Sequence, residues 1–356
     1  MQPNLVLQAN FVTNGFLAAQ GTYHGLFAPT NASRQQTNSG AITLTVTSAG
    51  VLSGKLTLGT NTPSLTGQFN PAGAATIITP RKGESNLITT LQLDFAGQTV
   101  AGSVTDGSFV AQVIADLDVF NSTHKATNYE GSYTFIIAGT DLPTVGPLGT
   151  SYGTVTVSPL GAVTFTVSLA DGTASPLNPS SVVSKDGYWP FYLPLDSGNG
   201  SLWSWNCFTN GAIMSATNAS WINATNSTKT ALYRVGFTNE AASIFGSAFN
   251  PTHKPLLALT NGQVILAGGN LPFAITNQIT LASNNTIALT NAADTNKLVL
   301  TINKTTGVIS GTFANPSSPK QTVNVSGVLL QNQTNAAGYF LGANQSGTFS
   351  LALPNP

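Results

Sequence analysis

The stretch "AITLTVTSAGVLSGKLTLG", residues 41–59, decides the fold class. Ile42, Leu44 and Val46 alternate with threonines, so one face of an extended segment is apolar and the other carries hydroxyl groups. Gly50 then provides a turn, and leucines rebuild the apolar face on the far side of it. Period-two alternation on both sides of a glycine predicts a half-buried antiparallel hairpin.

The same hairpin recurs along the chain. The segments "GTVTVSPLGAVTFTVSLADG" (153–172) and "LVLTINKTTGVISGTFANP" (298–316) align with the first on Gly50, Gly161 and Gly307. Asn-Gly and Asp-Gly pairs elsewhere are typical of tight hairpin turns. Since consecutive strands pair most readily with each other, the sequence predicts an all-β protein of antiparallel barrel-like or sandwich domains built from consecutive hairpins.

Breaks in this alternation suggest the domain limits. Residues 1–20 are interpreted as a leader or linker, and the polar segment "FNSTHKATNYEG" ends a first domain predicted at 21–127. A second β-region is predicted at 128–356, and a further division near residue 233 is left open. The N-terminus lacks the basic and apolar regions of a signal peptide. An exported form would therefore be the mature part of a longer precursor.

Composition excludes several classes of partner. Charged residues make up 7% of the chain, and the 12 basic and 12 acidic residues cancel, whereas a typical soluble protein has roughly 25% charged residues. No basic stripe is present to bind nucleic acid, and no segment has the roughly twenty apolar residues of a membrane span. A neutral hydroxyl and amide surface is typical of secreted and cell-surface β-proteins.

The stretch "GYWPFYLPLDSGNGSLWSWNCFTNG", residues 187–211, concentrates the aromatic residues. A register centred on Gly198 predicts a hairpin with Leu193 opposite Trp203 and Phe191 opposite Trp205. One face is then almost wholly apolar and is predicted to be core; it consists of Trp189, Phe191, Leu193, Leu195, Trp203, Trp205 and Cys207. Prolines lack a backbone donor, so Pro190 and Pro194 predict that one side of the first strand is an edge or is irregularly paired.

The opposite face of this predicted hairpin is the candidate ligand-binding surface. It combines Tyr188 and Tyr192 with Asn206 and Phe208, which could stack on and hydrogen-bond a neutral polysaccharide. The alternative is a second, partly buried sheet face with no ligand.

Catalytic chemistry has one weak candidate. Asp116 and Asp118 in "IADLDVF" lie two apart on a predicted strand, and a pair of separated carboxylates suits glycoside hydrolysis in principle. The alternative is two exposed aspartates that lead into a linker. The three histidines lie far apart in the sequence, so no metal site is predicted. No phosphate-binding or dinucleotide motif is present, and no cofactor is expected.

Several long motifs carry a family resemblance. They include "GTYHGLF" (21–27), "VSKDGYWPFYLPL" (183–195), "GSLWSWNCFTNG" (200–211), "LTINKTTGVISGTF" (300–313) and "GVLLQNQTNAAGYFLGANQSGTF" (327–349). Over about residues 20–353 the chain resembles an uncharacterised β-rich region of large secreted and surface proteins from verrucomicrobial and related bacteria. This resemblance implies an extracellular or cell-surface location and a β architecture. It implies no catalytic residues.

The sequence thus predicts a non-catalytic structural, adhesive or self-assembling β-module of an exported bacterial protein. Its expected partners are itself, other cell-surface modules or a neutral polysaccharide. A carbohydrate-binding module and a glycoside-active enzyme remain as alternatives, because fold alone does not decide among them.

Overall fold

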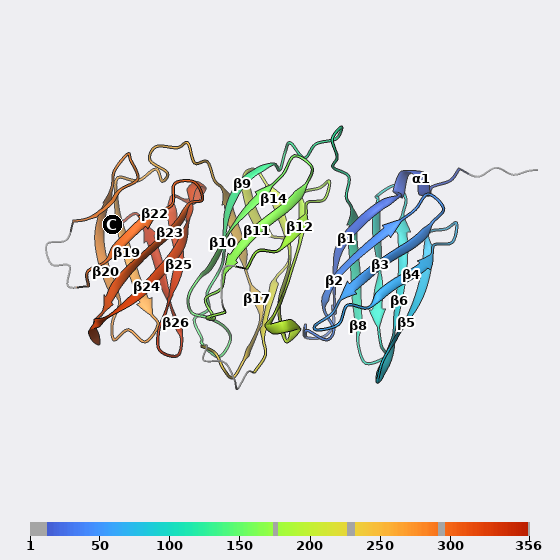
Figure 1. Cartoon of the computed structure of the whole chain (residues 1–356), viewed down its shortest axis with the longest axis horizontal. Coiled ribbons are helices and arrows are strands. Elements are labelled where there is room, and N and C mark those ends of the chain that lie inside the picture. The colour runs from blue at the N-terminus through green and yellow to red at the C-terminus, as the bar shows by residue number, and fades with distance from the viewer. Residues whose placement is uncertain (1–12, 174–176, 226–231, 291–295, 355–356) are drawn as a thin grey trace, which may run out of the picture.

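The structure, a computed structural model, describes residues 13–173, 177–225, 232–290 and 296–354. Three antiparallel sheets follow one another along the chain, and each curls into a nearly closed barrel. The three barrels stand side by side in one row (Figure 1). Strands account for 56% of the chain and helices for 3%, which confirms the predicted all-β architecture of consecutive hairpins and identifies its form as barrel-like.

The first barrel follows a short helix, α1 (Phe16–Ala19). Its strands are β1 (Gly21–Ala28), β2 (Gly40–Val46), β3 (Val51–Thr57), β4 (Ser64–Gln68), β5 (Ala74–Arg81), β6 (Glu84–Asp94), β7 (Thr99–Thr105) and β8 (Val110–Leu117). Neighbours in sequence pair with each other, except that β4 and β5 do not, and β1 pairs with β8. The barrel is therefore a simple meander joined through its first and last strands.

The second barrel elaborates the same plan. Its elements are β9 (Gly131–Ile137), β10 (Ser151–Val157), β11 (Ala162–Ser168), β12 (Ser180–Val182), β13 (Tyr188–Leu195), the 3-10 turn η1 (Asp196–Gly198), β14 (Gly200–Thr209), β15 (Ala212–Ser215), β16 (Ala219–Asn223), β17 (Phe237–Ala242) and β18 (Ile244–Ala248). Both β15 and β16 pair with β14, and they act as one interrupted strand. Likewise β17 and β18 pair with β16 and β15, and β18 joins β9.

The third barrel joins its first and last strands in the same way. Its elements are β19 (Asn261–Gly268), β20 (Ile275–Leu281), β21 (Ile287–Leu289), β22 (Val299–Ile302), β23 (Val308–Asn315), β24 (Ser318–Leu330), the 3-10 turn η2 (Gln331–Gln333), β25 (Asn335–Leu341) and β26 (Ser346–Ala352). Here β19 pairs with β26, and the unpaired edges belong to β21 and β22.

The three turn glycines that align in the sequence occupy the same place in their barrels. Gly50, Gly161 and Gly307 have φ of 74°, 79° and 75°, a region that L side chains avoid. Each glycine carbonyl accepts a hydrogen bond of 2.9 Å from the backbone N–H of a buried residue in, or directly after, the strand that follows the hairpin; these donors are Phe69, Val183 and Leu329. The shared hairpin is thus a repeated structural unit.

An aromatic ring from the start of each domain covers that glycine. A Cβ placed on the glycine would lie 2.7–2.8 Å from the ring, and the ring–glycine pairs are Phe16 with Gly50, Phe120 with Gly161, and Phe249 with Gly307. Only glycine fits beneath these rings. The segment 120–131, predicted as a linker, therefore contributes Phe120 to the second barrel.

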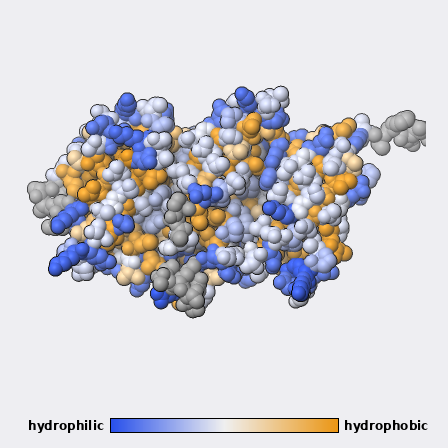
Figure 2. Space-filling view, in the orientation of Figure 1, coloured by the Kyte–Doolittle hydropathy of each residue, from blue (hydrophilic) through white to orange (hydrophobic). Residues whose placement is uncertain are grey.

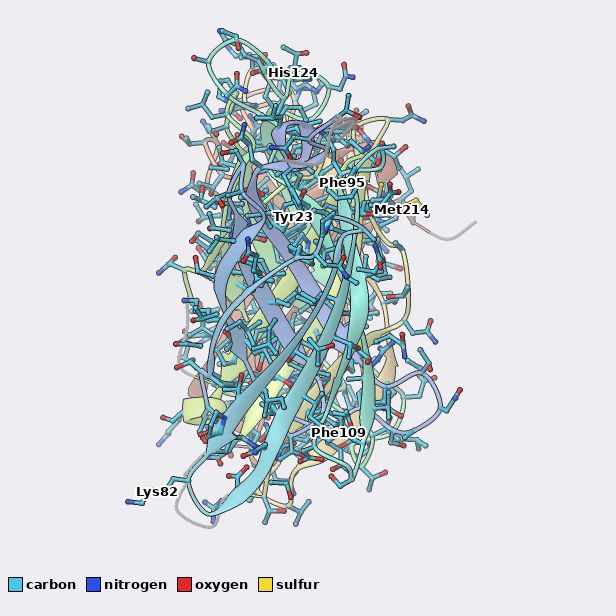
Figure 3. The ribbon with its side chains drawn as sticks, turned by 90° about the vertical axis from the view of Figure 1, so that its right-hand side faces the viewer. Tyr23, Lys82, Phe95, Phe109, His124 and Met214 are labelled. Atoms are coloured by element: carbon cyan, nitrogen blue, oxygen red, sulfur yellow. The ribbon has the colours of Figure 1, made fainter. Side chains whose placement is uncertain are left out.

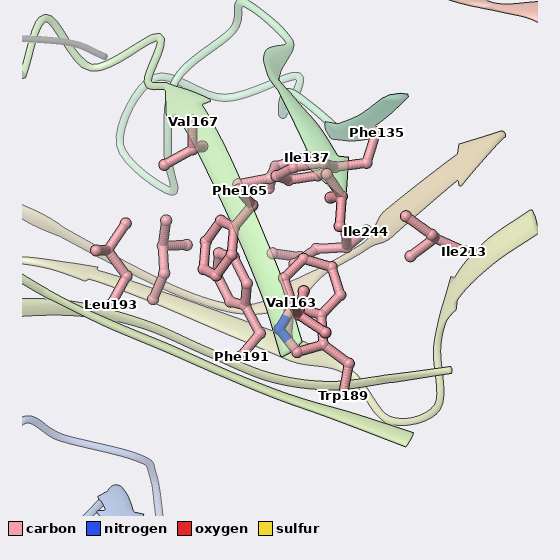
Figure 4. Packing of buried hydrophobic residues seen from close by; sticks show 14 of the residues in the cluster. Phe135, Ile137, Val163, Phe165, Val167, Trp189, Phe191, Leu193, Ile213 and Ile244 are labelled. Atoms are coloured by element: carbon pink, nitrogen blue, oxygen red, sulfur yellow. The ribbon is translucent and has the colours of Figure 1, made fainter. Parts of the chain in front are cut away.

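Aromatic side chains fill the middle of the second barrel. The ring of Phe165 lies 4.9 Å from Trp189 and 5.1 Å from Phe191, and Phe135 meets Trp189 edge-on at 5.9 Å. Figure 4 shows these rings converging from different strands. Packing of this kind buries large apolar areas and favours offset or edge-on contacts.

The sheets modify the predicted domain limits in two places. Phe16 and Ala19, inside the segment interpreted as leader or linker, are buried in the first core. The division considered near residue 233 falls within the second sheet's range, because β17 and β18 follow it, and the chain leaves that sheet between 248 and 261. Residue 233 therefore lies within the second barrel.

Candidate functional site

The aromatic hairpin β13–β14 has a register one residue away from the predicted one. Leu195 lies opposite Gly200, Leu193 opposite Leu202, and Tyr192 opposite Trp203. The prediction assumed a loop centred on Gly198. Instead the chain turns through residues 196–199, with positive φ at Asp196, Ser197 and Gly198. Turn geometry sets hairpin register, and a slip of one residue moves every side chain of a strand to the other face.

This slip moves three predicted core residues to the outside of the barrel. Trp189, Phe191, Leu193 and Leu195 point inward as predicted and are buried. Trp203 and Trp205 point outward and are buried against the first barrel, in a cluster with Leu26 and Ala28. Cys207 is only partly buried on the same outer face, where burial raises the pKa of its thiol.

The predicted ligand platform is divided between two faces. Asn206 and Phe208 point into the barrel and are 0% and 2% exposed, whereas Tyr188 and Tyr192 lie on the outer face. Tyr192 packs beside the tryptophans at the first barrel, and burial raises its pKa to about 12. Tyr188 is 40% exposed. The four residues therefore do not share a surface, and the physical reason is again the register.

The prediction from the prolines is confirmed. Within the described residues β13 pairs with β14 alone, so its other side is an unpaired edge. A side-chain bond crosses this opening, from Ser181 Oγ to the carbonyl oxygen of Pro190, at 2.9 Å.

Asp116 and Asp118 lie at the end of β8 beside the second barrel, and each has its own partner. Asp118 Oδ1 lies 3.0 Å from His24 Nδ1. Burial raises the pKa of the Asp116 carboxyl, although a hydrogen bond from Ser184 opposes that effect. Ser184 belongs to the second barrel, so Asp116 contributes to the contact between barrels.

We call this contact the first joint; it comprises the cluster of Leu26, Ala28, Trp203 and Trp205 and the polar contacts around it. Arg34, in the loop between β1 and β2, is the main polar link. Its guanidinium carbon lies 4.2 Å from the centre of the Trp203 ring, and Nη1 donates to the carbonyl of Asn218 at 2.7 Å. The backbone N–H of Arg34 donates to the Glu240 carboxylate.

The second and third barrels meet at a second joint. Its apolar cluster includes Ile136 and Tyr152 of the second barrel and Val328, Leu330 and Tyr339 of the third. Around this cluster, main-chain groups bond across the joint: Thr134 Oγ1 donates to Leu329 O at 2.5 Å, and Thr150 N donates to Gly338 O at 3.2 Å.

Tyr233 forms several hydrogen bonds at the second joint. Its hydroxyl accepts from the backbone N–H groups of Leu148 and Ser346, each at 3.1 Å, and shares a 3.0 Å hydrogen bond with Ser346 Oγ. Gly149 N also donates to Ser346 Oγ, at 3.1 Å. A position considered as a domain boundary is therefore a link between two barrels.

A large hollow lies at one end of the first barrel, where no site was predicted. It has a volume of about 630 Å³ and is lined by the loop 29–38 and by residues 107–112. A neighbouring hollow of about 380 Å³ shares Thr37, Ser108 and Phe109 with it and reaches Gly198 and Asn199 of the second barrel. Loop residues carry no periodicity, so the sequence pattern gave no sign of this site.

Across the described ranges, no group of three or more His, Cys, Asp and Glu side chains is placed to hold a metal ion. In that part of the chain, no helix has the length and apolar character needed to span a bilayer.

The chain is thus an array of three docked antiparallel β-barrels. No protein-family model and no curated protein matches its sequence. Among solved structures it is similar to transferrin binding protein B of Haemophilus parasuis, a vaccine antigen, with 9% identity, a TM-score of 0.23, and coverage of 93% of this chain and 75% of that one.

Two further structures show comparable similarity. Transferrin binding protein B of Neisseria meningitidis is 12% identical, with a TM-score of 0.22 and coverage of 94% of this chain and 76% of that one. A putative outer membrane protein of Bacteroides fragilis is 10% identical, with a TM-score of 0.20 and coverage of 66% and 100%. These likenesses are too distant to support a function, which has to be argued from the chain's own residues.

Proposed function

We propose that the chain is a non-catalytic structural module of an exported bacterial surface protein, in which three docked barrels keep neighbouring parts at a fixed spacing. The observation that carries this proposal is the use of two separate faces of the middle barrel. One face, on β13, β14 and β16, packs on the first barrel, and another, on β9, β10 and β18, packs on the third. Joints on both sides favour a rigid row over a flexible string.

The exported location is proposed from surface chemistry. Charged residues make up 7% of the chain, and most of the surface visible in Figure 2 has intermediate hydropathy with small hydrophobic patches. Hydroxyl and amide groups supply this polarity, and such a surface suits adhesive or self-assembling contacts with other surface modules.

The residues that suggested chemistry support a structural role. Trp203, Trp205 and Tyr192 are buried between barrels. Asp118 is paired with His24, and Asp116 with the second barrel. Neither aspartate lines the hollows of the first barrel. A glycoside hydrolase needs both carboxylates to face one substrate, and these two have separate partners.

Small-angle X-ray scattering of the whole chain tests the proposed rigidity. We expect one elongated particle whose dimensions stay constant from low to high salt, because the joints are mainly apolar. A distribution of dimensions, as from domains on free linkers, would contradict the proposal. Antibody labelling of intact cells of the source organism tests the location, and labelling only after lysis would refute it.

A further inference from the structure

The two adjoining hollows at the end of the first barrel form a continuous depression around Phe109. Figure 3 shows this side chain at the same end of the barrel as Lys82. Phe109 is half-buried, packs on the barrel core from its edge, and lines both hollows. A ring held in this way presents an aromatic surface at low entropic cost to a ligand.

The lining of the larger hollow is polar but uncharged. Its residues include Asn31, Gln35 and Gln112 but no Asp, Glu, Lys, Arg or His. The side chains of these three residues form no hydrogen bond with the described part of the protein. Each amide both donates and accepts. The depression therefore offers free, neutral hydrogen-bonding groups around a ring.

Of the two hollows, only the smaller one is lined by charged residues, and there one guanidinium is paired with two carboxylates. Arg81 lies 2.6 Å from Glu84 and 2.8 Å from Asp106, and its side chain is 12% exposed. Its Nε also donates to the carbonyl of Ser85 at 2.7 Å. These bonds hold the hairpin ends that form this wall and use three of the five N–H donors of Arg81. The two carboxylates beside the guanidinium disfavour an anionic ligand.

The opposite wall is held in place by the second barrel. Arg34 lies in the loop 29–38, and its bonds to Asn218 and its contact with Trp203 fix that loop against the first joint. A wall that is already ordered loses less conformational freedom when a ligand binds. Trp203, from the aromatic stretch singled out in the sequence, thus supports the hollow without lining it.

We propose that this depression binds a neutral oligosaccharide, with a sugar ring stacked on Phe109 and its hydroxyls bonded to Asn31, Gln35 and Gln112. Sugar hydroxyls, like amides, both donate and accept, and the C–H face of a pyranose suits an aromatic ring. The uncharged lining of the larger hollow disfavours phosphates and metal ions. A lining rich in amides and hydroxyls disfavours lipids. The joined hollows fit an extended chain of sugars, and this binding is independent of the spacer role.

Isothermal titration of the whole chain against soluble laminarin, xylan, mannan and starch tests the site. We expect binding to at least one of them and an affinity that changes little with salt. Phe109→Ala should raise the Kd about tenfold, and Gln112→Ala several-fold, a change of about 1 kcal/mol or less. Phe273→Ala is the matched control, since Phe273 is a 63% exposed aromatic outside these hollows; it should bind like the parent.

Arg34 is tested as a positioning residue. Arg34→Ala should weaken binding and speed hydrogen exchange in the loop 29–38, whereas Arg34→Lys should restore part of the affinity because a cation remains over Trp203. Circular dichroism checks folding, and if Phe109→Ala does not fold, Asn31→Ala and Gln112→Ala decide the outcome. Failure of the parent to bind any of the four polysaccharides, or unchanged affinity in the folded lining variants, would overturn the proposal.

Discussion

The two joints are built differently, although both bury a face of the middle barrel. The second joint surrounds its apolar cluster with bonds to backbone groups, among them those of Thr134 and Tyr233. The first joint relies on tryptophans and on long side chains at its edge, chiefly Arg34 and Lys185, whose Nζ donates to Gly97 O at 2.8 Å. Backbone groups are fixed by the sheets and lose little freedom when they pair, whereas long side chains lose rotamer entropy.

Buried polar atoms without a hydrogen-bond partner also distinguish the first joint from the second. On the face of β14 and β16 that meets the first barrel, Ser201 Oγ, Trp203 Nε1 and Ser220 Oγ are buried without a hydrogen-bond partner among the described residues. On the facing strand of the second joint, β25, the corresponding atom is Asn335 Oδ1. Each unpaired buried group costs about 1–3 kcal/mol. We infer that the second and third barrels unfold as one unit and that the first barrel separates more readily.

The largest effect should come from a charge in the second joint. Leu330 is 1% exposed there, and Leu330→Arg would bury an unpaired cation at a cost of about 3–5 kcal/mol. Calorimetry should then resolve a separate transition for the third barrel. Leu341→Arg is the control, because Leu341 on the neighbouring strand β25 is 42% exposed. A single transition unchanged from the parent would show that this joint does not couple the two barrels.

Trp203→Ala should open the first joint without unfolding a barrel. Trp203 is 5% exposed and contacts Arg34, and loss of such an anchor typically costs about 2–4 kcal/mol of interface energy. We expect larger scattering dimensions and faster hydrogen exchange in β1 and β14. Met214→Ala, a change at a 55% exposed side chain opposite Cys207 on the same outer face, should alter neither measurement. Collapse of the second barrel in Trp203→Ala would instead place this tryptophan in the core, as the sequence suggested.

The alternation of apolar and polar residues predicted the strands well, because this pattern involves only residues that are close in the sequence. In the hairpin at 41–59, Ile42, Leu44 and Val46 point inward and are buried, as their alternation with threonine predicts. Alternation also gave the inward face of β13 correctly. It failed for β14, because the register depends on the backbone conformation of residues 196–199, and composition does not specify that conformation.

The joints and the hollow could not be predicted for a different reason. Both depend on which sheet faces meet after folding. In the sequence, a tryptophan that is buried against a neighbouring barrel cannot be told from one that is buried inside its own barrel. Phe109 likewise follows an Asp-Gly turn and has no periodic partner, so only the approach of the loop 29–38 places it in the wall of a hollow.

Paired serine substitutions should change the joints in opposite directions. Ser220→Ala removes an unpaired hydroxyl from the first joint and should stabilise the docked state by about 1 kcal/mol. Ser346→Ala removes the acceptor of Gly149 N and a partner of Tyr233 and should destabilise the second joint by about 1–2 kcal/mol. Urea denaturation measures both. If both variants changed the free energy of unfolding in the same direction, the proposed difference between the two joints would be contradicted.

The smallest effect concerns the pH dependence of the first joint. Burial raises the pKa of Asp116 in the folded chain, while Ser184 and Lys185 oppose the shift and Asp186 adds to it. The unfolded carboxyl titrates near pH 3.9. The folded state therefore binds the proton more tightly than the unfolded state. The contribution of Asp116 to stability is full below about pH 3.9 and is lost as pH rises through the higher folded pKa.

Asp116→Asn removes this pH-dependent loss of stability. It keeps a side-chain oxygen that can accept a hydrogen bond from Ser184. The variant should gain stability relative to the parent between about pH 4 and 7, because the parent loses the contribution of its protonated carboxyl in that range. Melting curves across that range measure the difference, and Asp141→Asn, in an exposed loop, provides the control. His24 lies opposite Asp116 on β1 but pairs with Asp118, so the difference should persist in the His24→Gln background. A variant that loses stability as pH rises would mean that the Asp116 carboxylate is stabilised in the joint by Lys185, and the first joint would then be more polar than its tryptophans suggest.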